Sequence, residues 1–482
     1  MVEMAIKIKN GLRLGAVAGG FLLVCLAGQA SLQASAQASA FAGSVTAGPA
    51  TGDTLALTLD EAIERGLKNN LGVILTGTQK SALRGQKLEE LQPLLPKIDA
   101  NVNEALMQTD LAAEGLRIPG FPSVIGPFGY TDLRVNLNWT LLNLASMKHY
   151  MAAKHNFQAA EFTVQDAREM VVLAVGNAYL LAVADEARVE SVQAELKVAE
   201  GALHDAKASH EAGTSPKLDE LRARVDFQRE QQLLIAAQNA LEKDKLALAR
   251  TIGLPLEQKF TLADQTAFTG LDALNVDTVN LDAVSQEPET AIARAKENRA
   301  DRAALAEQTK AGEDEHKAAF DDRLPTIKAE ADYGDIGVNV RHSHGTGDAV
   351  GTLSIPVFKE AQFHGESLFS GAQLDALKAE LSDKNAQIDA DVREALLDLK
   401  AARKQVEVAR SNVDLAAEAL SEARLIYTSG VSDNLGVTDA LAAYAGANAQ
   451  LVASQYQYNM ARLSLARALG DTKNYKQYLG GK

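Results

Sequence analysis

The feature that most constrains this 482-residue chain is an internal repeat that covers most of its length. Residues 213–253 and 430–470 align without a gap at an offset of 217 residues, and residues 62–98 align with 291–327 at an offset of 229. The first alignment keeps residues at matching positions, among them Gly213/Gly430, Ser215/Ser432, Leu246/Leu463, Arg250/Arg467 and Gly253/Gly470. A repeat of this length indicates one architectural unit that is built twice.

The N-terminus is typical of a secretory signal peptide over residues 1–30. Three basic residues precede an apolar run at 14–27, and small residues follow it. We expect cleavage near residue 30, or at later small residues up to about residue 40, and a flexible segment over 31–56. The single cysteine, Cys25, lies inside the apolar run after large residues, which disfavours lipidation; removal of the signal would leave no thiol.

Composition favours long helices and argues against binding of nucleic acid. Aromatic residues make up only 5% of the chain, which is low for ordinary globular domains. The net charge of −15 becomes about −17 when a signal with three basic residues and one Glu is removed, so we expect no nucleic acid partner. Beyond the signal no run of 18 apolar residues occurs, so we expect no transmembrane helix.

Each half predicts a helix, a β-hairpin, a very long helix, a turn and a further helix. These halves span 57–253 and 288–470, with a connecting region at 254–287 and a tail at 471–482. The first helix of each half is expected to continue unbroken to a Leu-Pro pair, ending near Leu94 and Pro325 respectively.

Alternation of apolar and polar residues follows each Leu-Pro pair and predicts two strands per half, in hairpins at about 97–142 and 326–358. The hairpin loops are expected at 108–130 and 334–348. One strand has the clearest apolar face, which we expect to contact lipid: Leu133, Val135, Leu137, Trp139 and Leu141.

The long helices carry apolar residues at alternating steps of four and three, a pattern that we call the seam. In the second half the seam runs from Ile388 to Tyr427, and an offset of 217 gives Val171 to His210 with one polar interruption at Asp185. A period of 3.5 residues predicts helices packed side by side in a coiled coil. The second such helix, from about Gln362 to Tyr427, would be about 100 Å long at 1.5 Å per residue.

Four strands per chain leave two open sheet edges, which lipid does not tolerate. Three chains would supply twelve strands, within the range of outer-membrane barrels. The sequence therefore predicts a mostly α fold with a small β part, in which duplicated coiled-coil helices and two β-hairpins form a trimeric helical tunnel joined to a twelve-stranded barrel.

In order and spacing, these features resemble the TolC-like outer-membrane efflux proteins over residues 57–470. The resemblance rests on the opening at 57–63, both Leu-Pro strand starts, the strand end at 354–358, and the turns at 211–214 and 427–431. Thr140 stands where the second half has Pro356, which leaves the topology unchanged. The resemblance implies a passive exit duct in the outer membrane of a Gram-negative-type bacterium, reaching into the periplasm.

The same resemblance implies partners and candidate sites. The partners would be two further copies in a homotrimer, outer-membrane lipid, a periplasmic adaptor and an inner-membrane pump, for small-molecule efflux or type I protein secretion. The adaptor would dock on the two tips, where the long helices end: Gly213, Thr214, Ser215, Gly430, Val431 and Ser432. Gly213 and Gly430 are also expected to end each helix in a left-handed turn.

A periplasmic gate near the tips is implied at Asp219, Tyr427, Asp433 and Asp439. We predict a hydrogen bond between Tyr427 and Asp219; the alternative is that Tyr427 only completes the apolar seam. Asp219 and Asp439 would equally suit the first turn of a solvated helix.

No pattern in the chain indicates an enzyme. We find no Gly-x-Ser-x-Gly, Walker A or His-Glu-x-x-His motif, and we expect no catalytic, cofactor or metal site, since His342 and His344 lack a third ligand in sequence. The rival interpretation is an adhesive or structural coiled-coil protein of the cell surface.

Overall fold

The computed structural model describes residues 41–113, 115–263, 288–429, 431 and 435–479, which fall into two compact units. The helical unit takes its described residues from Met1–Gly77, Thr163–Ala300 and Asn385–Lys482, and the sheet unit consists of Thr78–Phe162 and Asp301–Lys384. The predicted signal peptide with Cys25, and the tip residues Gly430, Ser432 and Asp433, lie outside the described residues.

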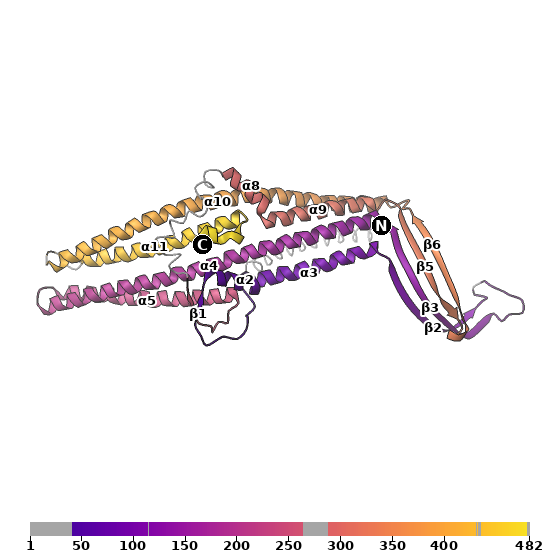
Figure 1. Cartoon of the computed structure of the whole chain (residues 1–482), viewed down its shortest axis with the longest axis horizontal. Helices are drawn as coiled ribbons and strands as arrows, with labels where there is room; N and C mark the ends of the chain where they lie inside the picture. Colours follow the sequence, from indigo (N-terminus) through magenta and orange to yellow (C-terminus); the bar gives the residue numbers. More distant parts are fainter. Residues whose placement is uncertain (1–40, 114, 264–287, 430, 432–434, 480–482) are drawn as a thin grey trace, which may run out of the picture. The chain divides into compact units, whose positions relative to one another are not determined.

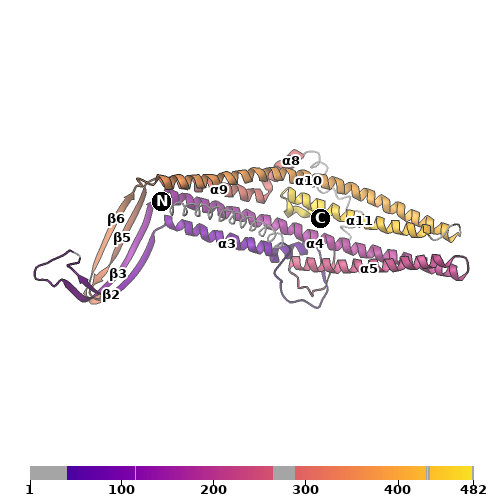
Figure 2. The same cartoon turned by 180° about the vertical axis from the view of Figure 1, so that it is seen from behind.

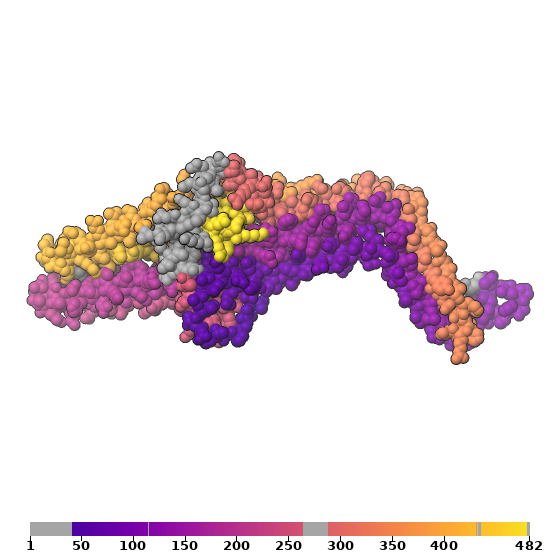
Figure 3. Space-filling view, in the orientation of Figure 1, coloured from indigo at the N-terminus to yellow at the C-terminus, as the bar shows by residue number. Residues whose placement is uncertain are grey.

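Two helical hairpins form the core of the helical unit. In the first repeat α4 (Leu144–Glu211) turns into α5 (Lys217–Ile252), and in the second α10 (Glu360–Thr428) precedes α11 (Leu435–Ala468). The helices α4 and α10 contain 68 and 69 residues, as the uninterrupted periodicity predicts. The two hairpins lie side by side in the helical unit (Figures 1 and 3).

The predicted seams are buried along most of their length. Because a repeat of 3.5 residues keeps these side chains on one face of a helix, each helix buries the face against its neighbours. Buried seam residues of the two repeats are Val171, Val175, Ala182, Val189, Ala199, Ala206, Ile388, Val392, Leu399, Val406, Ala409 and Leu420. The polar interruption, Asp185, lies beside Asp244 of α5; burial first, and then this second carboxyl group, raises the pKa of Asp185 to about 7.

The first helix of each repeat is broken, contrary to the prediction. The chain forms α2 (Leu59–Asn69) and α3 (Leu71–Leu91), then a 3-10 turn at Gln92–Leu94, and in the second repeat α8 (Pro288–Asn298) and α9 (Ala300–Asp321). At Asn70 the side chain replaces helix hydrogen bonds: Oδ1 accepts from the Gly72 amide at 2.9 Å, and Nδ2 donates to the Phe41 carbonyl at 2.8 Å.

The glycines at the ends of α5 and α11 explain why both breaks occur at matching positions. Gly253 and Gly470 have φ of 76° and 67°, the left-handed conformation that ends a helix. A Cβ atom on Gly253 would lie 2.7 Å from the Cβ of Asn69, and one on Gly470 would lie 2.9 Å from the Arg299 amide nitrogen. Each repeat therefore closes by packing a glycine backbone against its own helix break.

Residues 41–57, most of which lie in the segment expected to be flexible, form backbone contacts with the helices. The Val45 amide donates to the Asn69 carbonyl at 2.8 Å, and the Ala47 amide donates to the Gly253 carbonyl at 3.0 Å. Strand β1 (Leu55–Leu57) pairs in parallel with β4 (Phe260–Leu262), which lies in the predicted connecting region. At the other end of the chain, a 3-10 turn (Thr472–Asn474) and α12 (Tyr475–Leu479) bury Tyr478 and Leu479.

One described helix, α4, contains a stretch that is long and apolar enough to cross a membrane by length and composition. From the sequence we expected no such helix. Val171, Val175, Leu180 and Val183 of α4 are buried in an apolar cluster with residues of α2, α5 and α11. Packing inside the protein therefore accounts for these apolar side chains.

The sheet unit contains one antiparallel sheet in the order β2-β3-β5-β6 (Figure 2). Its strands are β2 (Lys97–Asp110), β3 (Val124–Leu142), β5 (Thr326–Gly337) and β6 (Ser343–Ser354). The strands are longer and the loops shorter than predicted, since the second hairpin leaves only residues 338–342 between strands, including the 3-10 turn Val340–His342. Glycine and proline at the start of β3, and polar residues and glycines at the start of β6, obscured the strand ends in the sequence.

Candidate functional site

Four of the predicted lipid-facing residues, Leu133, Val135, Leu137 and Trp139, share one face of the sheet with residues of the other strands. The fifth, Leu141, lies in a register shift between Thr140 and Leu142, where Leu142 pairs with Ile327. In register, Ala100, Val135, Tyr333 and Gly347 form one cross-strand row, and Ile98, Leu137, Ala331 and Ala349 form the next. Directly opposed residues lie on the same face, so in these two rows the face is apolar across all four strands; one row further along, Asp335 of β5 opposes Leu133 on this face. Val102 and Val135 on it are exposed to the extent of 74% and 50%.

The opposite face is polar and is held together by one arginine. Arg134 of β3 donates from Nε to Asp132 Oδ1 at 3.2 Å and from Nη2 to Thr346 Oγ1 of β6 at 3.0 Å, and it forms an ion pair with Asp332 of β5. This network joins three strands. Trp139 lies near one end of β3, where its Nε1 donates to the Leu94 carbonyl at 3.3 Å.

The first tip forms a tight reversal between α4 and α5. Gly213 has φ of 74°, as predicted for a left-handed helix end, and its amide donates to the His210 carbonyl at 2.9 Å. The Thr214 amide and hydroxyl both donate to the Ser209 carbonyl at 2.9 Å. Of the predicted docking residues in the second tip only Val431 is described, and it is 79% exposed.

The predicted hydrogen bond between Tyr427 and Asp219 is not formed. The Tyr427 hydroxyl is buried without a hydrogen-bond partner among the described residues, and the ring packs beside Leu420 and Val437. Asp219 is also buried, with Arg222 Nη1 at 3.8 Å from its Oδ1. Burial first, and then the Asp219 carboxylate, raises the pKa of Tyr427. Within the chain, Tyr427 therefore completes the seam.

A different pair joins the two hairpins near the tips. Thr438 Oγ1 on the first turn of α11 donates to Asp226 Oδ2 on α5 at 2.9 Å, and Asp226 also lies 3.3 Å from Arg229 Nη1. The predicted gate residue Asp439, next to Thr438, is exposed. Sequence reasoning missed Asp226, although it lies on the buried face of α5 at heptad spacing from Asp219.

Comparisons with known proteins agree with this architecture. A family profile described as outer membrane efflux protein matches residues 91–254 and 291–471. A comparison with curated proteins found no match.

Solved structures share the fold over most of their length. The CmeC outer membrane channel of Campylobacter jejuni is 17% identical, with 88% of this chain and 90% of that chain covered at a TM-score of 0.73. VceC of Vibrio cholerae is 18% identical, with 86% and 96% covered at 0.71, and the open state of the Neisseria gonorrhoeae MtrE channel is 19% identical, with 88% and 89% covered at 0.68. At these identities the likeness shows the fold alone. Because the profile spans both repeats and more than half of the chain, the chain belongs to the outer membrane efflux protein family, whose members are channels of the Gram-negative outer membrane that extend into the periplasm.

Proposed function

We propose that this chain is one of three identical subunits of an outer-membrane exit duct, which conducts substrates passively from a periplasmic adaptor and an inner-membrane pump to the exterior. The observation that carries the proposal is a four-stranded sheet with apolar cross-strand rows on one face and two unpaired edge strands, β2 and β6. Family membership favours this function over the rival adhesive stalk.

A shared barrel satisfies both sheet edges. The strands contain 12 to 19 residues, enough for a tilted strand to cross the hydrocarbon core, which takes about 9–11 residues. Pairing β6 of one copy with β2 of the next, in a closed ring of three copies, gives twelve strands with no free edge. The apolar face would then contact lipid, and the face that carries Arg134 would line the interior.

The repeat indicates how the helices of neighbouring copies meet. Within the chain, α11 packs on α4: Leu463 is fully buried, and a Cβ atom on Gly176 would lie 2.4 Å from its Cδ2 atom. The equivalent of Leu463 is Leu246 on α5, which is 48% exposed. A face that one repeat buries within the chain is therefore left open by the other repeat.

The same asymmetry appears in the charged and apolar residues around these leucines. Arg467 Nη1 lies 2.7 Å from Glu169 Oε2, whereas its equivalent Arg250 is exposed and has no ion pair within the described parts of the chain. Helix α10 shows the same asymmetry relative to α4. Leu397 of α10 is 67% exposed, whereas its equivalent on α4, Leu180, is buried. We therefore place α5 of one copy against α10 of the next, in the arrangement that α11 and α4 adopt within one chain.

Site-directed cross-linking tests this contact. The Tyr456 hydroxyl of α11 donates to Asn177 Oδ1 of α4 at 2.6 Å, and the equivalents of these two residues are Asn239 on α5 and Glu394 on α10, both exposed. With Asn239→Cys and Glu394→Cys in one chain, a short bifunctional thiol reagent is expected to give dimer and trimer bands on denaturing gels. Each single-cysteine variant should give at most a dimer.

Two further cysteine pairs serve as controls for the geometry of the contact. Asn177→Cys with Tyr456→Cys should link within one chain and leave the band at monomer size, and Asn239→Cys with Ala401→Cys, two helical turns along α10, should link poorly. Monomers on native gels would contradict the trimer itself. Native trimers that link no better through Glu394 than through Ala401 would contradict only the α5–α10 contact.

We also propose that the tips dock the adaptor, through Gly213, Thr214, Ser215 and Val431 together with Gly430 and Ser432. The exposure of Gly213, Thr214 and Val431 supports this, as does the tight reversal of the chain at the first tip. A photo-crosslinking residue at position 214 in the native host is expected to capture an adaptor, whereas one at position 85 of α3 is not. Equal capture at both positions would remove the docking role.

The closed state of the gate is expected to depend on Asp226 and Thr438. Thr438→Val removes only the hydroxyl that joins α11 to α5, so it should free the hairpins and raise single-channel conductance in planar bilayers. Tyr427→Phe should conduct like the parent, because the Tyr427 hydroxyl has no hydrogen bond in the described chain. If Tyr427→Phe opens the channel and Thr438→Val does not, the gate role belongs to Tyr427, as first predicted from the sequence.

A further inference from the structure

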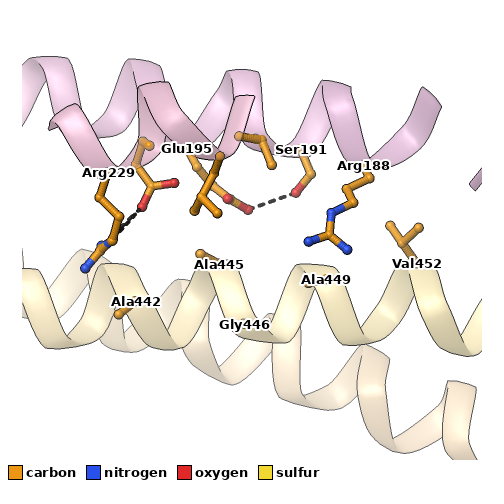
Figure 4. Close-up of a pocket in the computed structure, with 12 residues that line it drawn as sticks. Arg188, Ser191, Glu195, Arg229, Ala442, Ala445, Gly446, Ala449 and Val452 are labelled. Atoms are coloured by element: carbon orange, nitrogen blue, oxygen red, sulfur yellow. Dashed lines mark hydrogen bonds and ion pairs between the residues drawn. The ribbon is translucent and has the colours of Figure 1, made fainter. Parts of the chain in front are cut away.

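A cavity of about 350 Å3 lies between α4, α5 and α11, in a part of the helical unit that neither the sheet nor the tips use. Figure 4 shows Arg188, Ser191 and Glu195 on one wall, facing Ala445, Gly446 and Ala449 of α11 on the other. Cavities of this size, with apolar walls and a few polar groups, are typical of small-molecule sites.

The other repeat has different residues at the positions equivalent to those that line this cavity. On α11 the wall consists of Ala442, Ala445, Gly446 and Ala449, where the corresponding positions of α5 hold Val225, Gln228, Arg229 and Gln232. The acidic residues of the cavity are not repeated either, since the positions equivalent to Glu195 and Glu230 are Asn412 and Ala447. The small side chains of α11 and the two carboxylates are therefore not repeated at the equivalent positions of the other repeat.

The carboxylates exceed their cationic partners. Glu230 is 1% exposed; its Oε1 atom accepts from Arg229 Nη2 at 3.1 Å, and its Oε2 atom is buried without a hydrogen-bond partner among the described residues. Arg229 is shared with Asp226, 3.3 Å away. A buried carboxylate oxygen without a partner is costly. Around the cavity there are three carboxylates, Asp226, Glu195 and Glu230, against two guanidinium groups, Arg188 and Arg229.

Glu195 adds a second carboxyl group to the same wall. It is 3% exposed, accepts from Ser191 Oγ at 2.9 Å, and accepts from Asn448 Nδ2 at 3.4 Å. Burial, and to a smaller extent the negative charge of Glu230, raises the pKa of Glu195, while Arg188 lowers it. A positive charge between the two carboxyl groups would stabilise both of them in the ionised form.

We propose that this cavity binds a small organic cation, with an ammonium or amidinium group donating to Glu230 and Glu195 and an apolar body against the Ala442–Ala449 wall. The side chains of Val192, Leu233 and Val452 complete the apolar lining of the cavity. Such a site would occur once in each chain.

The test uses the full mature chain in detergent, with 2-phenylethylammonium as the probe and neutral 2-phenylethanol as its matched control, measured by calorimetry and by saturation-transfer NMR. The cation should bind at least about tenfold more tightly than the alcohol, since a charge-assisted hydrogen bond distinguishes them. Glu230→Gln keeps the shape of the side chain and should remove most of that preference.

A second variant fills the cavity. A Cβ atom on Gly446 would meet no atom within 4 Å, so Gly446→Leu can extend into the open space, and replacement of a helix glycine favours folding. We expect at least tenfold weaker binding of the cation. Gly436→Leu, an equally open position of α11 outside the cavity, should bind like the parent. Equal binding of cation and alcohol, or binding that neither Glu230→Gln nor Gly446→Leu changes, would overturn the proposal.

Discussion

Val135→Arg is expected to prevent assembly of the duct in the outer membrane. Val135 lies in the middle of the apolar face, opposite Ala100 on one side and Tyr333 on the other, and half of its side chain is exposed. An arginine on the lipid face near mid-membrane costs about 2–4 kcal/mol. Three copies in one barrel would therefore lose about 6–12 kcal/mol.

The matched control is the next residue along the strand. Asn136 points to the polar face, where it is opposite Asp99 and Asp332, so Asn136→Arg places the same charge near carboxylates. Trimer recovered from outer-membrane fractions on cold denaturing gels is the measurement. Loss of trimer for Val135→Arg but not for Asn136→Arg is the expected result, and equal yields would mean that this face does not contact lipid.

Much of the fold could be predicted from periodicity because single faces of helices and strands are buried. The helix expected from about Gln362 to Tyr427 matches α10 to within two residues at each end, and the alternation at Leu133 to Trp139 gave one face of β3. Both patterns report which side chains avoid water, and in this chain those faces run without interruption over long stretches.

The features that could not be predicted depend on polar groups that packing brings together. Hydrophobic periodicity carries no information about such contacts. The helix break at Asn70 arises from hydrogen bonds to Phe41 and Gly72, one of which is distant in sequence. The tie between hairpins pairs Thr438 with Asp226, 212 residues away, where the sequence had suggested Tyr427. Heptad spacing on α5 could have found Asp226 and Asp244 on the buried face, but hydrophobic patterns pass over acidic residues.

The sequence did reveal one acidic seam position, Asp185, and the structure indicates that its ionisation lowers the stability of the folded chain. Asp185 lies beside Asp244, and its pKa is raised from 3.8 to about 7, so the folded chain holds a proton that the unfolded chain releases near pH 4. Because the folded pKa is above the unfolded one, stability is lost as the pH rises from about 4 to about 7. After a discount for partial exposure, ionisation of the pair costs about 2–4 kcal/mol per chain above pH 7.

Asp185→Ala, which installs the residue found at the equivalent position Ala402, is therefore expected to stabilise the protein by about 2–4 kcal/mol at pH 8 and hardly at all at pH 4. Thermal loss of helical circular dichroism in detergent, measured at both pH values, gives the difference. Asp398→Ala, on the exposed face of α10, makes the same change in helix propensity and should shift the two melting temperatures equally. If the melting temperature of the parent falls from pH 4 to pH 8 by no more than that of Asp185→Ala, the proposed effect is absent. The folded chain would then hold no extra proton at Asp185 and Asp244, and the seam would tolerate the charge.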